Sequence, residues 1–403
     1  MRRHRNLRNG GDDGFPLPYP PCHRDIAERR FVEGLADERA ESRGVEASAR
    51  PPPPAILIGA GSVNRIEETE DLETLSSFFR EVFPEDEINT TVEVLRWRYR
   101  KSAPDAWRGR NLVWCSEGRI AGHFGILPVL LNVNGAVVRT AWFIDWVVFP
   151  EFRGRAGGIR LLQEALERFP IGLCAGLTER SEGIIRRMGW KDLGKTDRFV
   201  LPLGVSALPG LRGFERLVGE TVRRAMGFFR TERQDVGETS EAFLPPSHAV
   251  REVGGGSIRV VRNTEYLRAR YSDPAPWPRF FLEVSGRDKS GADFRTWSVW
   301  SVKPERGGGG RGRILEYLAN TGSREAVEKT IRAGLRECRA RGANLLEFNG
   351  RRVFPPEWRF RFPFIRREGL RMMWYATKKA EVPEGIGNAE DWYVTAGDAD
   401  QER

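Results

Sequence analysis

The sequence predicts an α/β protein of the α+β type, with a mixed sheet, in which one fold occurs as two tandem copies. Three observations predict it. Segments with strand and helix periodicity follow one another between residues 63 and 202 in the order β-α-α-β-β-β-α-β-α-β. A glycine-rich turn, Phe149–Gly158, joins one of these strands to a helix. The pattern Glu93–Tyr99 recurs at Glu265–Tyr271, and in both places Pro and Trp follow before further strands.

The composition is typical of a globular protein with room for two cores. The chain has 403 residues, of which 40% are hydrophobic, with 12 Trp and 23 Phe. Residues 1–60 differ, because they mix Arg, Glu, Pro and Gly and include the run Pro51–Pro54. They predict a disordered leader. The net charge of +9 suits polyanions, but acidic and basic residues are interspersed, which disfavours nucleic acid as a partner.

Compartment and metal content follow from three absences in the sequence. No apolar run approaches the ~20 residues of a membrane helix, so no membrane partner is expected. The arginine-rich N-terminus lacks the apolar core of a signal peptide. The cysteines have no paired spacing, which indicates neither a metal site nor a disulfide framework. They are Cys22, Cys115, Cys174 and Cys338. A cytoplasmic protein without a metal is predicted.

The first domain is expected over residues 61–202. It starts with a strand at Val63–Glu67, after which Asp71 is placed to cap a helix with apolar residues at helical spacing. A second helix is expected at 91–99, and a period of two then predicts antiparallel strands with reversals at Glu117–Gly118 and Asn132–Gly135. The later elements are strands at 111–117, 119–131 and 136–149, a helix at 159–169, a strand at 171–177, a helix at 181–188 and a strand after Trp190.

The turn Phe149–Gly158 carries the strongest functional signal. Where a strand enters a glycine-rich helix start, several backbone N–H groups and the helix dipole converge on one spot and attract an anion. Glycines let that anion approach the backbone closely. The alternative is an ordinary glycine turn before a surface helix.

The spacing of this turn resembles the pyrophosphate loop of the GCN5-related N-acetyltransferase (GNAT) superfamily. The residues that fall on that pattern are Val148, Pro150, Arg153, Gly154 and Gly158. Ala156 stands where the family usually has its first loop glycine. The resemblance implies the acyl-CoA N-acyltransferase fold, acetyl-CoA or another acyl-CoA as co-substrate, and N-acetyl or N-acyl transfer by direct attack of an amine in a ternary complex.

The resemblance also implies where the co-substrate lies. The pantetheine arm would follow the strand that ends at Val148, and the Val148 N–H would stabilise the thioester oxygen. The residues expected to bind the cofactor are Val147, Val148, Arg153, Gly154, Arg155, Ala156, Gly157 and Gly158.

Asp145 and His123 are the candidate catalytic residues. Asp145 is the only ionisable residue between Thr140 and Glu151, and the family often places an acidic base on this strand. Burial among aromatic neighbours would disfavour its charged form, as suits a general base. It could instead anchor a substrate ammonium, or bind an arginine or a backbone N–H as a structural acid. His123, on the preceding strand, is the second candidate, although a lone strand histidine is usually part of a core.

The helix after the strand at 171–177 departs from the family. Many members have a tyrosine four residues before Gly189 that protonates the leaving thiolate, but Ile185 stands in that place here. Glu179 and Arg180, just before this helix, are expected to line the acceptor cleft.

A helical connector is expected at 203–246 and a second, degenerate GNAT-like domain at 247–378. Its plain helix start, with Ser323 as N-cap, replaces the glycine-rich loop, so the second half should bind acyl-CoA poorly or not at all. Its expected work is to cover the sheet of the first half or to wall the acceptor cleft. Residues 379–403 are predicted to form a flexible acidic tail.

Two alternatives to an acyltransferase remain open on the sequence. One is a non-catalytic CoA-binding or interaction protein of the same fold, which Ile185 and Ala156 favour. The other is a tRNA-dependent aminoacyl transferase built from the same tandem fold. For the enzyme, the acceptor is an amine of a small molecule or peptide, and the sequence leaves its identity, the acyl chain length and the oligomeric state open.

Overall fold

The computed structural model describes residues 64–203, 238–246, 256–305, 309–353 and 365–398. These residues belong to one compact unit. The predicted leader at 1–60 and most of the predicted helical connector lie outside the described residues. Within the described ranges, no helix is long and apolar enough to cross a membrane.

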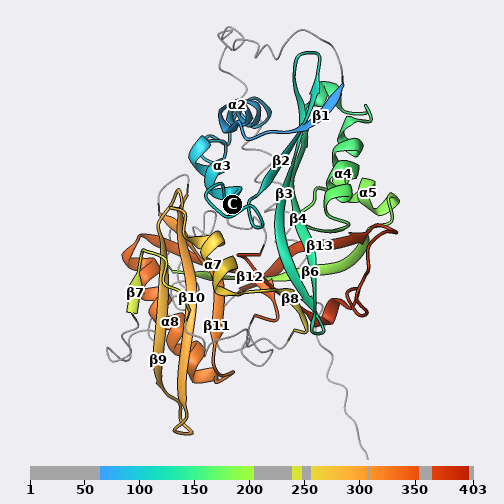
Figure 1. Cartoon of the computed structure of the whole chain (residues 1–403). Coiled ribbons are helices and arrows are strands. Elements are labelled where there is room, and N and C mark those ends of the chain that lie inside the picture. Colours follow the sequence, from blue (N-terminus) through green and yellow to red (C-terminus); the bar gives the residue numbers. More distant parts are fainter. Residues whose placement is uncertain (1–63, 204–237, 247–255, 306–308, 354–364, 399–403) are drawn as a thin grey trace, which may run out of the picture. The chain divides into compact units, whose positions relative to one another are not determined.

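The first half has the predicted element order (Figure 1). Asp71 caps the first helix as predicted, since its Oδ1 accepts from the Thr74 N–H at 3.0 Å. The elements are β1 (Arg65–Glu68), α2 (Leu72–Val82), α3 (Val92–Arg98), β2 (Arg110–Ser116), β3 (Arg119–Val133), β4 (Ala136–Val148), a 3₁₀ turn (Pro150–Phe152), α4 (Gly157–Arg168), β5 (Ile171–Ala175), α5 (Glu179–Arg187) and β6 (Lys191–Pro202).

The second half repeats much of this order. The pattern that recurs in the sequence forms α3 in one half and α7 in the other, and both helices precede three antiparallel strands. The elements are β7 (Glu238–Ser240), β8 (Ile258–Val260), α7 (Thr264–Tyr271), β9 (Arg279–Arg287), β10 (Asp293–Pro304), β11 (Gly310–Ala319), α8 (Arg324–Ala340), β12 (Ala343–Arg351) and β13 (Ile365–Ala376). Ser323 occupies the N-cap of α8, but its side chain makes no capping hydrogen bond.

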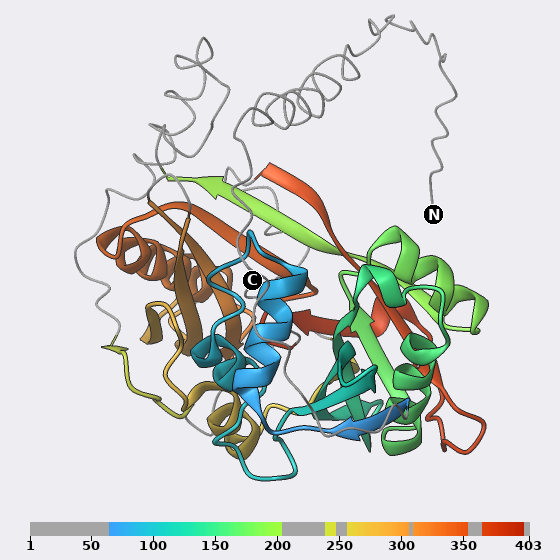
Figure 2. The same ribbon diagram turned by 90° about the horizontal axis from the view of Figure 1, so that it is seen from above.

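The two halves share one sheet and exchange their last strands. The strand order is β1-β2-β3-β4-β5-β13-β6-β12-β11-β10-β9-β7. β13, from the second half, lies between β5 and β6, while β6 pairs with β12 of the second half. Figure 2 shows β6 and β13 running between the two groups of strands. The predicted boundary near residue 202 therefore divides a continuous sheet.

The prediction of a flexible tail is wrong for residues 379–398. A 3₁₀ turn at Ala389–Asp391 leads into β14 (Trp392–Thr395), which pairs with β12 and β8. Trp392, Tyr393 and Val394 are each 1% exposed. The acidic residues around them suggested a solvated tail, but these apolar side chains bury enough surface to hold the segment in the core.

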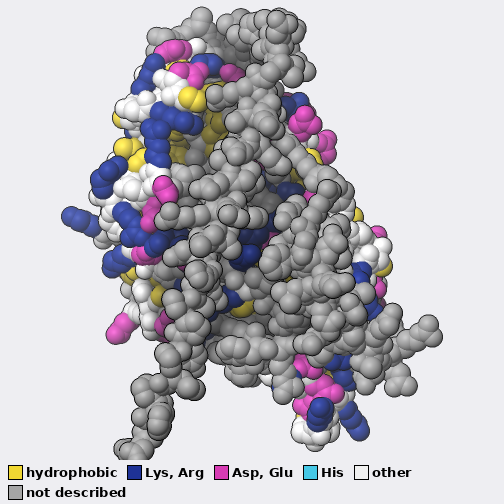
Figure 3. Space-filling model, turned by 180° about the vertical axis from the view of Figure 1, so that it is seen from behind, with side chains coloured by type: hydrophobic (Ala, Val, Ile, Leu, Met, Phe, Trp, Pro, Cys, Tyr) yellow, Lys and Arg dark blue, Asp and Glu magenta, His cyan; other side chains and the backbone are white. Residues whose placement is uncertain are grey.

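Helices cover both faces of the first half's sheet. α4 packs Leu161, Leu162 and Ala165 into the core, and α2 lies on the opposite side (Figure 2). From α2, Phe79 meets His123 of β3 edge to face, with ring centroids 5.0 Å apart. On the outer surface, basic side chains are interspersed with acidic and apolar ones over the described part of the face in Figure 3. The bases and acids are thus mixed in space as they are in the sequence.

Candidate functional site

β4 is irregular just before its end. In its register with β3, Val147 faces His123 and Ile144 faces Gly125, so Asp145 and Trp146 together oppose one residue. This is a β-bulge. Asp145 has a φ of 51°, in the left-handed region that costs a residue with a side chain about 1–3 kcal/mol. Such strain is often found at functional sites.

β4 and β5 separate beyond the bulge. They pair in parallel only at residues 141–143 of β4 and 172–174 of β5. Among the described residues, Ile144–Val148 have no ladder partner on the β5 side. The two strands therefore leave a gap between them at their carboxyl ends.

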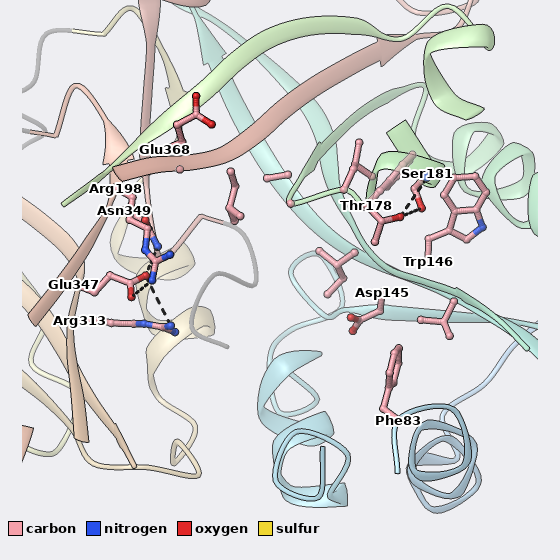
Figure 4. Close-up of a pocket in the computed structure, with 18 of the residues that line it drawn as sticks. Phe83, Asp145, Trp146, Thr178, Ser181, Arg198, Arg313, Glu347, Asn349 and Glu368 are labelled. Atoms are coloured by element: carbon pink, nitrogen blue, oxygen red, sulfur yellow. Dashed lines mark hydrogen bonds and ion pairs between the residues drawn. The ribbon is translucent and has the colours of Figure 1, made fainter. Parts of the chain in front are cut away.

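A cavity of about 510 Å³ occupies this gap (Figure 4). Its first wall is formed mainly by Ile144, Asp145, Trp146, Val147, Thr178 and Ser181. The opposite wall is formed by second-half strands and by β6, the first-half strand that pairs with β12. Its residues are Arg198 of β6, Arg311 and Arg313 of β11, and Glu347 and Asn349 of β12. The volume is in the range of small-molecule sites.

Asp145 is held by two groups at the end of α3. Its Oδ2 accepts a hydrogen bond from the Tyr99 hydroxyl at 2.6 Å and lies 3.4 Å from an Arg98 guanidinium nitrogen. The Asp145 side chain is 1% exposed, yet the residue lines the cavity. The arginine partner considered for a structural acid is therefore present. Arg98 and Tyr99 both donate to the same carboxylate oxygen and so fix the orientation of the side chain.

His123 lies behind the bulge and outside the lining of the cavity. Its ring is fully buried, with Nδ1 3.1 Å from the Asp145 carbonyl oxygen and Nε2 3.2 Å from Asn111 Oδ1. A neutral imidazole that donates from Nδ1 must accept at Nε2. Exchanging the amide O and N of Asn111 would supply that donor. Without the exchange, the buried Asn111 Nδ2 has no hydrogen-bond partner among the described residues. His123 thus supports the backbone of the bulge.

Val147 and Val148 form the end of the separated strand. Val147 lines the cavity, whereas Val148 does not. The Phe149 N–H bonds to the Ala121 carbonyl of β3 at 3.0 Å. Because antiparallel pairs alternate, the N–H and C=O of Val148 face away from β3, toward the gap. Arg153 Nε donates to that Val148 carbonyl at 3.1 Å, so Arg153 ties the loop to the end of the strand.

The loop after β4 presents an exposed turn at the start of α4. Gly154 has a φ of +88°, and no atom lies within 4 Å of where its Cβ would be. Arg155 pairs with Glu117 at 2.7 Å, and both side chains are at least half exposed. Ala156 occupies the N-cap of α4 without a capping side chain. A helix start without a capping side chain, beside an exposed arginine, is a type of site that attracts anions.

Gly157 and Gly158 have packing roles that the sequence did not indicate. A Cβ on Gly157 would lie 2.1 Å from the Trp114 ring, and a Cβ on Gly158 would lie 3.1 Å from a methyl of Val148. Trp146 Nε1 donates to the Gly158 carbonyl at 3.1 Å. These glycines let α4 approach β2 and β4, so the helix start touches the bulge directly.

Glu179 and Arg180, which were expected to line the acceptor cleft, do not line the cavity, although their neighbours do. Thr178 and Ser181 line it and are hydrogen bonded through their hydroxyls at 3.0 Å, whereas Glu179 and Arg180 are exposed outside it. Ile185 is 2% exposed and offers no proton. Arg98 and Tyr99 were missed as site residues, although the repeated pattern Glu93–Tyr99 ends on them.

The described cysteines are buried in the core. Cys115, Cys174 and Cys338 are free and buried, and burial raises the pKa of each thiol, that of Cys115 to about 11. No group of His, Cys, Asp and Glu that could hold a metal occurs within the described ranges.

Residues 63–192 match the family model described as an acetyltransferase (GNAT) domain. Residues 63–192 are a GNAT domain. The domain includes the bulge of β4, the glycine-rich loop, α4 and α5. The match ends before the second half begins. No curated protein sequence matches the chain.

Solved structures resemble the chain only distantly. A probable N-acyltransferase of unknown function from Enterococcus faecalis V583 is 12% identical, with a TM-score of 0.48 over 78% of this chain and 73% of that one. Saccharomyces cerevisiae N-myristoyltransferase with bound myristoyl-CoA is 12% identical, with a TM-score of 0.47 over 81% and 87%. A GCN5-related N-acetyltransferase from Anabaena variabilis ATCC 29413 is 16% identical, with a TM-score of 0.44 over 77% and 72%. Similarities of this size fix neither an activity nor a substrate for this chain.

Proposed function

We propose that the chain is a CoA-dependent N-acyltransferase, acting most directly as an N-acetyltransferase, that moves an acyl group from acyl-CoA to an amine in a ternary complex. The observation that carries the proposal is the bulged, unpaired end of β4 beside the exposed start of α4, inside the GNAT domain. The gap supplies a place for an extended thioester arm, and the helix start supplies a place for its phosphates.

The phosphates of CoA are assigned to the turn Gly154–Ala156. The N–H groups at the start of α4 have no capping side chain, and the helix dipole adds positive potential there. The exposed Arg155–Glu117 pair is of a kind worth at most ~1 kcal/mol, so a phosphate can displace Glu117 at little cost. Arg153 holds the turn in place through Val148. Gly157 and Gly158 act through packing.

The thioester is assigned to the open edge of β4. The Val148 N–H, which faces the gap, is the donor for the oxyanion that forms when the amine attacks. A preorganised donor of this kind contributes about 3 kcal/mol to stabilising the transition state. Val147 forms part of the cavity wall beside it.

Asp145 is assigned to the attacking amine. An alkyl amine with a pKa of ~10 is neutral only about once in a thousand at pH 7, so a carboxylate that accepts its proton or anchors it favours the reaction. Tyr99 and Arg98 fix the Asp145 side chain. We assign His123 to positioning the bulge through the Asp145 carbonyl, in place of the catalytic role that the sequence suggested.

A loop variant tests the co-substrate site without disturbing the core. Ala156→Asp adds a carboxylate at an exposed N-cap, where aspartate favours the helix but repels phosphate. Ala156→Asn is the neutral control of the same shape. Calorimetric titration should give acetyl-CoA binding by the wild type and the Asn variant, and at least roughly tenfold weaker binding by the Asp variant. Absence of acetyl-CoA binding by the wild type would refute the proposal.

A non-catalytic CoA-binding protein is the second candidate. The buried Ile185 in place of the family's proton donor favours it. However, a CoA thiol has a pKa near ~8.5 and can leave as a thiolate, so the missing donor need not abolish transfer. Normal acetyl-CoA binding with no release of free CoA thiol across a broad amine panel would support this second candidate.

A further inference from the structure

The wall of the cavity that faces Asp145 is built from three neighbouring strands. β12 lies between β6 and β11, with Asn349 directly opposite Arg198, and Glu347 opposite Arg313. Arg311 lies two residues before Arg313 on the same face of β11. The exchange of strands between the halves therefore gathers three guanidinium groups around one carboxylate.

The arginines of this wall share Glu347 as a partner. Glu347 is 2.9 Å from both Arg198 and Arg311 and 3.9 Å from Arg313, and Arg311 also pairs with Glu305. Burial opposes the ionisation of Glu347, but the arginines outweigh it and lower its pKa. Glu347 is therefore ionised at neutral pH, with three guanidinium groups around it.

Two of these arginines are open to a ligand. The side chains of Arg198 and Arg311 are 36% and 26% exposed, whereas that of Arg313 is 6% exposed. Asn349 donates to Glu347 at 2.8 Å, and its Oδ1 is buried without a partner among the described residues. Arg198 and Arg311 can thus donate to an oxyanion, while Arg313 adds charge behind them.

The charges of the cavity lie at opposite ends. Figure 4 shows Arg198, Arg313 and Glu347 on one side and Asp145 with Trp146 on the other. The lining residue Glu368 does not change this balance, because it pairs with Lys195 and its side chain is 78% exposed. An amine near Asp145 would thus face a cationic wall across the cavity.

We infer that the acceptor is an anionic amine, which carries a carboxylate or phosphate besides its amino group. Its oxyanion binds Arg198 and Arg311, and its amine points to Asp145. This inference rests on the proposed function and names the substrate class of that site. A polyamine is disfavoured as an acceptor, because its further cations would lie beside these guanidinium groups.

Matched acceptor pairs test the inference. The pairs are an α-amino acid against its amide, and phosphoethanolamine against ethanolamine, with release of CoA thiol from acetyl-CoA as the readout. The acidic member of at least one pair should have a kcat/KM about 10- to 100-fold higher, as a charge-assisted Arg contact predicts. The pair that responds tells carboxylate from phosphate. Equal use of both members in both pairs would overturn the inference.

An arginine variant separates binding from a merely structural role. Arg198→Gln should raise KM for the acidic acceptor about tenfold and so reduce the preference for the acidic over the neutral acceptor. Arg287→Gln, which removes an exposed pair between Arg287 of β9 and Asp293 of β10, is the control and should change neither the KM nor the preference. Equal losses for acidic and neutral acceptors in Arg198→Gln would contradict the inference.

A binding measurement distinguishes the two possible failures. If acetyl-CoA binds but no acceptor releases thiol, titration of the protein–CoA complex with the amino acid and its amide decides the matter. Selective binding of the acid, lost in Arg198→Gln, supports the inference although transfer is absent, and equal binding overturns it. Absence of acetyl-CoA binding refutes the proposed function, and the inference with it.

Discussion

The two halves of the molecule contain the same contact between a tyrosine and a carboxylate. In the first half, Tyr99 at the end of α3 donates to Asp145 on β4 at 2.6 Å. In the second half, Tyr271 at the end of α7 donates to Glu316 on β11 at 3.2 Å. β4 shifts register against β3 near Asp145, and β11 shifts against β10 beside Glu316. The repeated sequence pattern thus corresponds to a repeated tyrosine–carboxylate contact.

The halves differ in what lies beyond this contact. β11 and β12 also separate, after Ile314, but the end of the chain fills their gap. Gly397 donates its N–H to the Leu315 carbonyl at 3.0 Å, β14 pairs with β12, and the Tyr393 hydroxyl donates to the Tyr317 carbonyl at 3.0 Å. We call this filling segment, residues 392–398, the plug.

The plug also supplies a carboxylate, Asp398, to the buried ion pair of Glu316 and Arg262. Arg262 lies 2.8 Å from Glu316 and 2.6 Å from Asp398, and all three side chains are 1% exposed or less. In the first half the corresponding gap is the cavity. The comparison teaches that the second half lacks more than a glycine-rich loop, because the chain itself occupies the place where the first half has room for a thioester.

The largest expected effect is on kcat, and it should distinguish the two carboxylates. Asp145→Asn should lower kcat by roughly 10²- to 10⁴-fold, as expected for loss of a group that acts on the amine proton. Glu316→Gln should leave kcat unchanged, because the plug isolates it from the cavity. Steady-state rates across pH check both. A base role predicts that Asp145→Asn recovers at high pH, whereas an anchor role predicts a raised KM at every pH.

The plug is the next target. Trp392→Ala should cost about 3–5 kcal/mol of unfolding free energy, because it empties a fully buried indole site. Val382→Ala, at a side chain that is 41% exposed, is the control and should cost little. Urea unfolding measures both. A small cost for Trp392→Ala would mean that the plug is only loosely held.

A glycine-to-alanine change in the plug and another in the loop after β4 sharpen the contrast further. Gly397→Ala should destabilise by about 1–3 kcal/mol, since its Cβ would lie 2.0 Å from the Tyr271 hydroxyl oxygen. Gly154→Ala meets no atom within 4 Å and should cost only the roughly 1 kcal/mol of its positive φ, but it should weaken acetyl-CoA binding. Thermal unfolding with and without acetyl-CoA separates the two, and ligand stabilisation should fall only in Gly154→Ala.

The smallest effect concerns pH. Burial raises the pKa of Glu316 from 4.5 to about 7, although Arg262 opposes the shift. The folded state therefore binds a proton that the unfolded state releases, so this group lowers stability as pH rises from 4.5 to 7. Glu316→Gln should lack that contribution. The difference in unfolding free energy between wild type and variant should thus change across this window, and a constant difference would contradict the assignment.

The sequence predicted most of the first half because its elements are signalled locally. The cap at Asp71 and the turns at Glu117–Gly118 and Asn132–Gly135 need only neighbouring residues, and all are confirmed. β13 was missed, since its first residues are charged and show no clear alternation. The strand exchange could not be predicted, because it pairs residues as far apart in the chain as Cys174 and Met373.

The same limit applies to the candidate site. Asp145 stood out as the one acid in an apolar strand, but its partners Arg98 and Tyr99 come from a helix almost fifty residues earlier. Arg198, Arg311 and Arg313 carried no signal at all, since they meet only where β6, β12 and β11 become neighbours. Local patterns identified the chemistry of the first wall, and only the sheet order identified the second.

The exchanged strands also affect how the protein is made. β5 is the edge of the first half's sheet until β13 joins it, and β13 begins at Ile365. At about 5–20 residues per second, roughly 10–40 s pass on the ribosome between the synthesis of Ala175 and that of Ile365. During that time the nascent chain carries an unpaired strand edge, a template for mispairing with other chains. The sheet of the GNAT domain, although the domain is continuous in sequence, is therefore completed only after β13 has been synthesised.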